Sequence, residues 1–328
     1  MFRNGTTLDF SNNSTIENKY HFFSQLTSNL SIVIIVIGVI FNTLTFLIFR
    51  LDKELKKMPS MVILSFVCIS DTSSLFIWNL NGFLANFNLR IEYFNISTCK
   101  FFTFMQYSSL EISGLLLSLC SVDRYFTIVT KPGSFISKLP FGSYKSSFIW
   151  SVSIILFVCS LNSYLLLADR LLKSNYNFEC YVLVSGFRIY DTWDKIHLFL
   201  YSFIPFTIMA IFNFLLIRKT RLSKKITPIG ITQKSKDRKN LTYTLFKISI
   251  AFILMTLPST IAFGFLNDSN FDYIMNKVIL FKLLDNLSFF HHTTLFFTCF
   301  LSNFTFRNSV LNIIQVIKCK FLKHFKIC

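Results

Sequence analysis

The chain has 328 residues, of which 52% are hydrophobic and only 15% are charged, and its mean hydropathy is +0.53. This composition excludes a soluble globular protein with a wet surface, so we expect the chain to lie in a membrane. Membrane orientation accounts for the formal net charge of +17, and no nucleic acid partner is predicted.

Seven apolar segments are long enough to cross a membrane, since about 20 helical residues span roughly 30 Å of hydrocarbon. The predicted fold class is an all-α membrane protein, a seven-transmembrane helix bundle with a short amphipathic eighth helix. The predicted divisions are an extracellular tail (1–25), a transmembrane domain (26–301) and a cytoplasmic amphipathic helix and tail (302–328). The seven segments are approximately 26–50, 60–84, 99–129, 146–168, 195–218, 241–266 and 277–301.

The polar amino-terminal segment carries acceptor triplets for N-glycosylation that begin at Asn4, Asn12 and Asn13. Asn95 begins another triplet in a later loop. An outside amino terminus places 23 of the 33 Lys and Arg residues on the inner side, where such residues accumulate in membrane proteins. We therefore predict a plasma-membrane protein with an extracellular amino terminus and a basic inner face that meets anionic lipid.

The second and third segments carry charges that a membrane makes costly. Asp71 lies 12 residues beyond Pro59, which places it near the midplane, and Ser113 lies at matching depth. Asp123 and Arg124 lie where the third segment leaves the membrane.

One face of the third segment carries a row of residues that runs from near one end of the segment to the other. Gln106, Ser113 and Leu117 lie within about 20° of the direction of Arg124 at 3.6 residues per turn. Glu111 points about 220° away from Arg124, so we expect it to face a neighbouring helix.

The cysteines outside the membrane have two predicted uses. Cys99 and Cys180 are the two on the outer, oxidising side, so we expect a disulfide between them. Cys319 and Cys328 lie in the basic tail and are candidates for acylation, with free thiols as the alternative. The segment near 169–194 combines a turn with alternating residues and predicts a β-hairpin.

Pro205 and Pro258 fall in the middle of the fifth and sixth segments, where each predicts a kink and, as a functional alternative, a hinge. In the seventh segment, Asp285, Ser288 and His292 share one face and form a polar stripe.

A zinc site and an enzyme site are not predicted. His291 and His292 are adjacent and are expected to point about 100° apart, so they do not form a two-histidine metal face. The nine glycines supply neither a phosphate-binding loop nor a nucleophile elbow.

The order and spacing of these residues resemble the rhodopsin-like G-protein-coupled receptors over nearly the whole chain. The chain looks like a divergent member, most similar to invertebrate neuropeptide receptors of the FMRFamide type. The matching residues are Asn42, Leu64, Asp71, Cys99, Asp123, Arg124, Tyr125, Trp150, Pro205 and Pro258.

The resemblance implies roles for several residues. Asp123, Arg124 and Tyr125 would couple to a heterotrimeric G protein, with Arg124 held by Asp123 at rest and released when the sixth helix moves outward. Asp71 and Ser113, with Asn42 in the same polar core, would bind an allosteric sodium ion. The alternative is a protonated Asp71 in a structural network, and no other cofactor is implied.

Two signatures of the family are altered. Phe252 of the activation core is present, but Thr256 occupies the usual tryptophan position and Asn213 stands where a tyrosine is common. The residues 294–298 stand in place of Asn-Pro-x-x-Tyr, and Asn303 is interpreted as the entrance to the tail helix. We therefore expect altered switching.

The predicted ligand pocket contains Gln106, Asp285 and Ser288. Gln106 replaces the aspartate of amine receptors and Ser288 replaces the lysine of opsins, which argues against both ligand classes. The predicted hairpin resembles the lid of peptide receptors, so the resemblance favours a peptide ligand. A small-molecule chemosensory receptor of the same fold is the alternative. A transporter or channel is the competing class, although the internal repeats typical of transporters are not evident.

Overall fold

The computed structural model describes residues 10–84, 87, 89, 91, 94–129, 140–167, 170–174, 177–181, 183–184, 187–188, 196–226, 233–263 and 274–324. Within these ranges, side chains are described except at 10–21, 24, 170–188, 220–241, 274–278 and 316–324.

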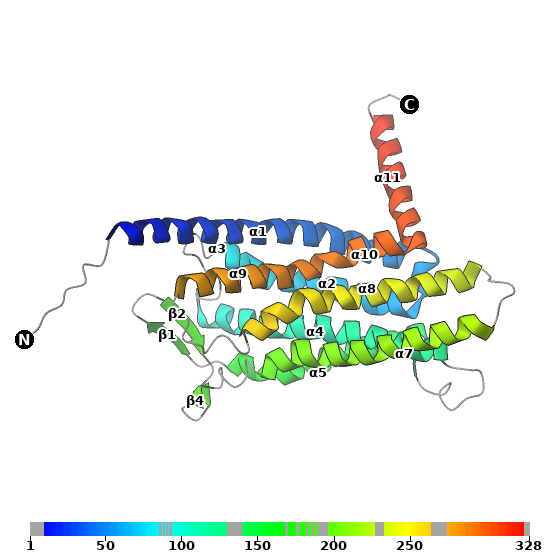
Figure 1. Ribbon diagram of the computed structural model, residues 1–328, viewed down its shortest axis with the longest axis horizontal. Coiled ribbons are helices and arrows are strands. Elements are labelled where there is room, and N and C mark those ends of the chain that lie inside the picture. Colours follow the sequence, from blue (N-terminus) through cyan, green and yellow to red (C-terminus); the bar gives the residue numbers. More distant parts are fainter. Residues whose placement is uncertain are drawn as a thin grey trace, which may run out of the picture.

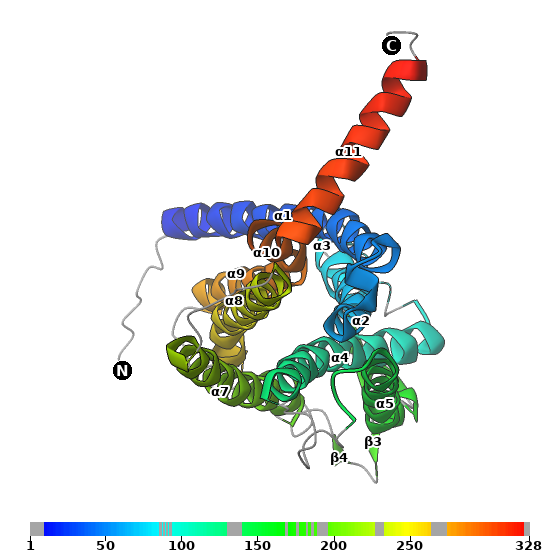
Figure 2. The same ribbon diagram turned by 90° about the vertical axis from the view of Figure 1, so that its right-hand side faces the viewer.

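Long helices run side by side along the length of the molecule (Figure 1). Seen from one end, they surround a common centre, with α4 in contact with α2, α5, α7 and α8 (Figure 2). The α-helices are α1 (Phe10–Leu51), α2 (Pro59–Ser74), α3 (Leu80–Leu84), α4 (Ile96–Val129), α5 (Tyr144–Asn162), α7 (Ile204–Ile226), α8 (Gln233–Ile261), α9 (Ile274–Phe290), α10 (Thr294–Ser302) and α11 (Phe304–His324). The shorter turns are η1 (Leu55–Lys57), η2 (Leu75–Asn79), η6 (Ser163–Leu167), η7 (Phe199–Phe203) and η9 (His291–Thr293).

Six helical segments of the described chain are long and apolar enough to cross a membrane. They are Gln25–Leu51, Pro59–Leu84, Ile96–Val129, Tyr144–Leu167, Ile196–Lys219 and Thr242–Ile261, close to the first six predicted segments. The seventh predicted segment forms α9, η9 and α10, which we call the seventh helix; the 3₁₀ turn η9 divides it into pieces of 17 and 9 helical residues. The seven-helix prediction is therefore confirmed.

The inner faces of the helices form one apolar core, and apolar side chains also cover the outside. Leu64, Leu116 and Phe252 are fully buried at the centre. Phe214, Leu254 and Leu301 are each more than 60% exposed on the outside of the bundle. Exposed apolar side chains are unfavourable in water but favourable in contact with lipid tails, which agrees with a membrane location.

The amino-terminal and carboxy-terminal helices extend beyond the bundle. α1 begins at Phe10, so the segment 10–25, predicted as a tail, is helical where it is described. α11 has 21 residues and leaves the bundle at a steep angle (Figures 1 and 2), so it is longer than the short helix predicted.

Asn303 marks the end of the bundle, as predicted. Its extended backbone ends α10, and its side-chain Oδ1 accepts the N–H of Phe306 at 3.1 Å to begin α11. Phe306 is fully buried against Phe49 and Phe296. Ser309 on α11 donates its hydroxyl to Asp52, which holds the new helix against the turn between α1 and α2.

A β-hairpin forms in the predicted segment between α5 and α7. β1 (Arg170–Ser174) pairs antiparallel with β2 (Asn177–Tyr181), and Leu171 pairs with Cys180. A second, unpredicted hairpin joins β3 (Leu183–Val184) to β4 (Phe187–Arg188). Both lie at one end of the bundle (Figure 1).

Candidate functional site

The three residues predicted to form a ligand pocket line one cavity. Gln106 on α4 and Asp285 and Ser288 on α9 face a cavity of about 410 Å³, a size typical of small-ligand sites. Asp285 is the single carboxylate among its described lining residues, so the cavity suits a ligand with a cationic group. The other lining residues are Trp78, Tyr107, Leu110, His197, Leu198, Tyr201, Ser259, Thr260, Phe263 and Phe289.

A second cavity of about 370 Å³ adjoins the first. Trp78, Gln106, Asp285 and Phe289 line both, so Asp285 lies where the two cavities meet. The indole Nε1 of Trp78 donates to the carbonyl oxygen of Gln106 at 3.2 Å, which fixes the wall between η2 and α4. The π-helical turn η2, which contains Trp78, allows this side chain to face inward.

Glu111 on α4 faces neighbouring helices, as predicted, and its carboxylate contacts two of them beside the cavity. Its Oε2 accepts from Asn162 Nδ2 on α5 at 2.7 Å, and its Oε1 lies 2.9 Å from His197 Nδ1. Glu111 is 1% exposed and His197 6% exposed. The ring of His197 also meets Tyr107 edge to face at 4.3 Å between centroids. The network therefore fixes one wall of the cavity.

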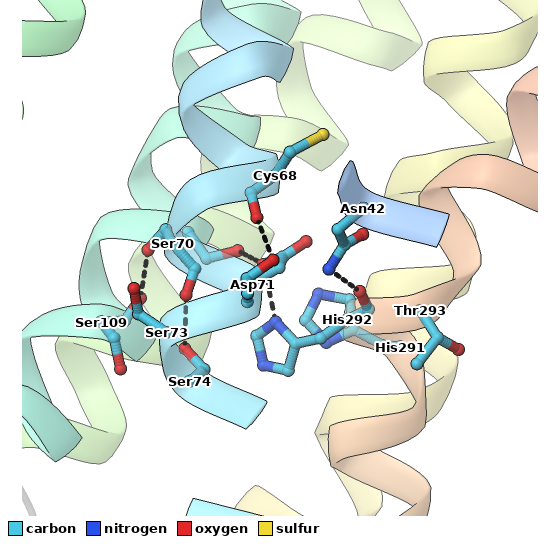
Figure 3. A network of polar contacts seen from close by, with 12 residues as sticks. Asn42, Cys68, Ser70, Asp71, Ser73, Ser74, Ser109, His291, His292 and Thr293 are labelled. Carbon is cyan, nitrogen blue, oxygen red and sulfur yellow. Dashed lines mark hydrogen bonds and ion pairs between the residues drawn. The ribbon is translucent and has the colours of Figure 1, made fainter. Parts of the chain in front are cut away.

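The predicted polar core converges at the middle of the bundle (Figure 3). Ser113 on α4 donates its hydroxyl to Asp71 Oδ1 at 2.5 Å, as the matching depths predicted. Asn42 on α1 donates to the carbonyl oxygen of His292 at 3.0 Å. His292 Nδ1 in turn lies 2.7 Å from Asp71 Oδ1, so one carboxylate connects α2, α4 and the seventh helix.

The two adjacent histidines lie closer together than the angle between neighbouring helical residues led us to expect. The imidazole centroids of His291 and His292 lie 4.0 Å apart. Ligand atoms of Asp71, His291 and His292 all fall within 4.8 Å of one another. The helical angle fixes only the direction at Cβ, and two further side-chain torsions bring both rings to the same carboxylate (Figure 3).

Phe252, predicted for the activation core, lies next to this polar centre. It is fully buried on α8. Its ring meets His291 edge to face at 5.0 Å and Tyr201 at 6.1 Å between centroids. Thr256, one turn further along α8, donates its hydroxyl to the Phe252 carbonyl at 2.7 Å and is itself 1% exposed. The threonine is therefore enclosed in the core beside Phe252.

The predicted charged triplet lies at the opposite end of α4 from the cavity. Arg124 donates from Nε to the hydroxyl of Ser60 on α2. Tyr125 meets Phe212 on α7 edge to face at 5.5 Å between ring centroids. The triplet thus contacts helices on both sides of α4.

Asp123 has a backbone partner that the sequence did not indicate. The N–H of Gly142, just before α5, donates to Asp123 Oδ1 at 2.8 Å. Gly142 has a φ of 77°, in the left-handed region that favours glycine. Its role depends on this backbone angle, which explains why charge and spacing along the chain could not reveal it.

The two predicted kinks have different surroundings. Pro205 follows the π-helical turn η7, as expected where proline removes a hydrogen bond. Gly114 on α4 approaches it closely, and a Cβ there would lie 2.9 Å from the Tyr201 carbonyl oxygen. Pro258 lies inside α8, three residues before its end at Ile261.

The candidate modification sites are only partly described. Asn95 is exposed and caps α4 by accepting the N–H of Thr98 at 2.8 Å. Asn4 and Cys328 lie outside the described residues. Asn12 and Asn13 lie on α1, Cys180 on β2 and Cys319 on α11, but their side chains are not described. These assignments stay predictions.

Comparison with known proteins bears on the whole arrangement. A family model described as 7 transmembrane receptor (rhodopsin family) matches residues 41–312. That match spans α2 to α10 and includes the cavity, the polar core and the charged triplet. No curated protein matches the chain.

Proposed function

Because the chain belongs to the rhodopsin family of seven-transmembrane receptors, we propose that it binds an extracellular peptide and activates a heterotrimeric G protein. Family membership makes it a multi-pass signalling receptor and not an enzyme. The cavity that joins Gln106, Asp285 and Ser288 carries the ligand part of the proposal, and the contacts of Arg124 carry the coupling part.

The proposed ligand is a peptide with a cationic side chain near an amidated end, as in the FMRFamide type. Asp285 supplies the complementary charge, with Ser259 Oγ 3.5 Å from its Oδ1. Aromatic residues such as Tyr107 and Phe289 surround the site and suit an aromatic peptide side chain. A second cavity shares part of its lining with the first, and we propose that a chain of several residues lies across both.

The proposed orientation places this cavity outside the cell. It rests on the 23 Lys and Arg residues assigned to the inner side against 10 on the outer side. The hairpin of β1 and β2 lies at the cavity end and contacts α4. We assign Cys99 and Cys180 as a disulfide between α4 and β2; Cys99 is buried and is not among the described free thiols. Glycosylation at Asn4, Asn12, Asn13 and Asn95 belongs to the same proposed face.

The proposed signal passes through residues that touch between the two ends. Tyr201 lines the cavity and meets Phe252 on α8, and Phe252 meets His291. A ligand that displaces Tyr201 therefore acts directly on α8, and Pro258 is the proposed hinge for its outward movement. Arg124 then leaves the hydroxyl of Ser60 and contacts the G protein instead.

The proposed inner face is basic and binds membrane lipid. α11 begins at the inner end of the bundle and is held there by Phe306. Acyl chains on Cys319 and Cys328 would attach the helix more firmly to the bilayer.

A screen of amidated peptides against small volatile odorants tests the proposal, with G-protein activation in cells as the readout. We expect activation by basic amidated peptides, and a 10- to 100-fold loss of potency in Asp285→Asn, about 1–3 kcal/mol for one charge-assisted contact. Asp268→Asn, in a predicted outer loop, is the matched control with little effect.

Three results would contradict parts of the proposal. Activation by odorants alone would favour the chemosensory alternative. Equal peptide potency at Asp285→Asn and at the wild type would contradict the proposed pairing of Asp285 with a cationic side chain of the ligand. Solute flux in proteoliposomes without a G protein would favour the transporter class, against which the family match already argues.

A further inference from the structure

We propose that His197 is a specificity-determining residue of the ligand cavity, and that it selects a ligand whose aromatic side chain carries a hydrogen-bond donor, best matched by the phenol of tyrosine. His197 lies in the fifth membrane-spanning helix, Ile196–Lys219, and lines the cavity of about 410 Å³ together with Asp285. This assignment rests on the proposed function, because it pairs a second side chain of the proposed peptide with a particular atom of the cavity.

Glu111 fixes the orientation and the tautomer of the His197 ring. His197 Nδ1 lies 2.9 Å from Glu111 Oε1, and Asn162 Nδ2 donates to Glu111 Oε2 at 2.7 Å. The oxygens of a carboxylate only accept hydrogen bonds, so His197 Nδ1 carries the hydrogen. In the neutral ring the lone pair is therefore on Nε2, on the side of the ring away from Glu111.

The Nε2 atom of His197 is the polar atom that this side chain offers to a ligand. Among the described residues, none bonds this atom, and the protein does not enclose it completely. Because the ring lines the cavity, a ligand there can reach the lone pair. A ligand that fills the cavity without a donor at this point leaves the nitrogen desolvated and unpaired, which costs free energy.

The surroundings of His197 favour an aromatic ring as the carrier of that donor. Tyr107 meets the imidazole edge to face at 4.3 Å between centroids, and Tyr201 stacks on it at 6.0 Å with an interplanar angle of 7°. Apolar side chains that line the same cavity are Leu110, Leu198 and Phe263. A phenol supplies both a flat apolar ring and a single hydroxyl donor, so it matches this wall better than the side chain of phenylalanine does.

Asp285 leaves the neutral donor to His197. A cationic group of the ligand binds a carboxylate more strongly than it binds a neutral imidazole, because hydrogen bonds between opposite charges are the stronger ones. The cavity therefore offers two different acceptors, Asp285 for a cation and His197 for an uncharged hydroxyl. A basic amidated peptide that carries a tyrosine beside its cationic residue meets both requirements.

The first experiment compares two basic amidated peptides that differ only in a tyrosine or a phenylalanine beside the cationic residue, with G-protein activation in cells as the readout. We expect the tyrosine peptide to be about 10-fold more potent at the wild type, as is typical of one hydrogen bond to a buried group. In His197→Phe the potency ratio should fall to about one, because this variant keeps a ring in the wall but has no acceptor.

Matched variants separate recognition from folding. Thr260→Val removes another hydroxyl from the lining of the same cavity and should keep the potency ratio. Glu111→Leu keeps His197 but removes the group that orients it, so the ratio should fall while the phenylalanine peptide keeps its potency. The triple variant Glu111→Leu, Asn162→Leu, His197→Phe leaves no member of the network unpaired. It should give a ratio of about one even where His197→Phe alone fails to reach the cell surface.

Two results would overturn the proposal. Equal potency of the two peptides at the wild type would show that the cavity recognises no phenol. A wild-type ratio that persists in both His197→Phe and the triple variant would place the partner of the hydroxyl at another residue.

A second measurement does not depend on G-protein activation. Thermal unfolding of the purified full-length receptor in detergent is measured with tyrosinamide or with phenylalaninamide at equal concentration. Tyrosinamide should raise the melting temperature of the wild type more, and the two compounds should act equally on His197→Phe. If both peptides are silent in cells, a larger shift from tyrosinamide would contradict the proposed G-protein activation alone, and equal shifts would overturn the role of His197 as well.

Discussion

The N–H of Gly142 donates to the carboxylate of Asp123 across 2.8 Å, so a residue just before α5 fixes the acid beside Arg124. This contact requires the positive φ of 77° at Gly142. Asp123 therefore has a partner in the backbone, whereas the family resemblance implies the neighbouring guanidinium.

Gly142→Ala should destabilise the receptor. A Cβ at this position would lie 2.9 Å from Thr127 Oγ1, and the left-handed backbone costs a non-glycine residue about 1–2 kcal/mol. Thermal unfolding in detergent measures the loss. Gly82→Ala is the control, because its Cβ would meet only Ser31 Oγ at 3.7 Å. Equal melting temperatures for the two variants would show that the strain is absent.

Arg124→Ala should abolish G-protein activation while surface expression stays close to that of the wild type. The guanidinium is the proposed contact with the G protein, and no other cation takes its position on α4. Ser60→Ala removes the hydroxyl that Arg124 Nε contacts but keeps the arginine, so this variant should still activate. Normal signalling by Arg124→Ala would refute the assignment.

Glu111→Leu should lower stability by about 1–3 kcal/mol, because it leaves Asn162 and His197 buried without their carboxylate. The triple variant Glu111→Leu, Asn162→Leu, His197→Phe replaces all the partners with apolar groups. It should recover most of the loss, since apolar replacement of a whole buried network is often neutral. If the single and triple variants melt at the same temperature, the network contributes nothing.

Thr256→Trp should destabilise the receptor by about 1–3 kcal/mol, although tryptophan is usual at this position in the family. Thr256 is 1% exposed and packed beside Phe252, so a larger ring forces its neighbours apart. Thr256→Val keeps the volume and should change the melting temperature little. A tryptophan variant more stable than the wild type would show that the core beside Phe252 can accommodate an indole ring, against this prediction.

Much of the architecture could be predicted because membrane burial leaves a simple record in the sequence. The length of the apolar segments predicted the membrane-spanning helices. The matching depths of Asp71 and Ser113 along their helices predicted the contact between them. Asn303 was correctly interpreted as the start of the tail helix. Shared helical faces brought Gln106, Asp285 and Ser288 to one cavity.

The remaining features depend on geometry that periodicity does not contain. Gly142 acts through a backbone angle, and Ser60 reaches Arg124 across two helices. The angle of about 100° between adjacent helical residues did not indicate that the rings of His291 and His292 lie 4.0 Å apart, because ring atoms lie well beyond Cβ. His197 had no assigned role, although the buried carboxylate of Glu111 required a partner of this kind.

The seventh helix is interrupted at His291–Thr293 by a 3₁₀ turn that contains no proline, so each residue keeps its amide hydrogen. Such a turn can change to α-helix by exchanging carbonyl partners. Since the rise falls from about 2.0 to 1.5 Å per residue, three residues would shorten the helix by about 1.5 Å and rotate α10 by roughly 60° about its axis. α11, which continues from α10 through Asn303, would follow that screw motion beyond the end of the bundle.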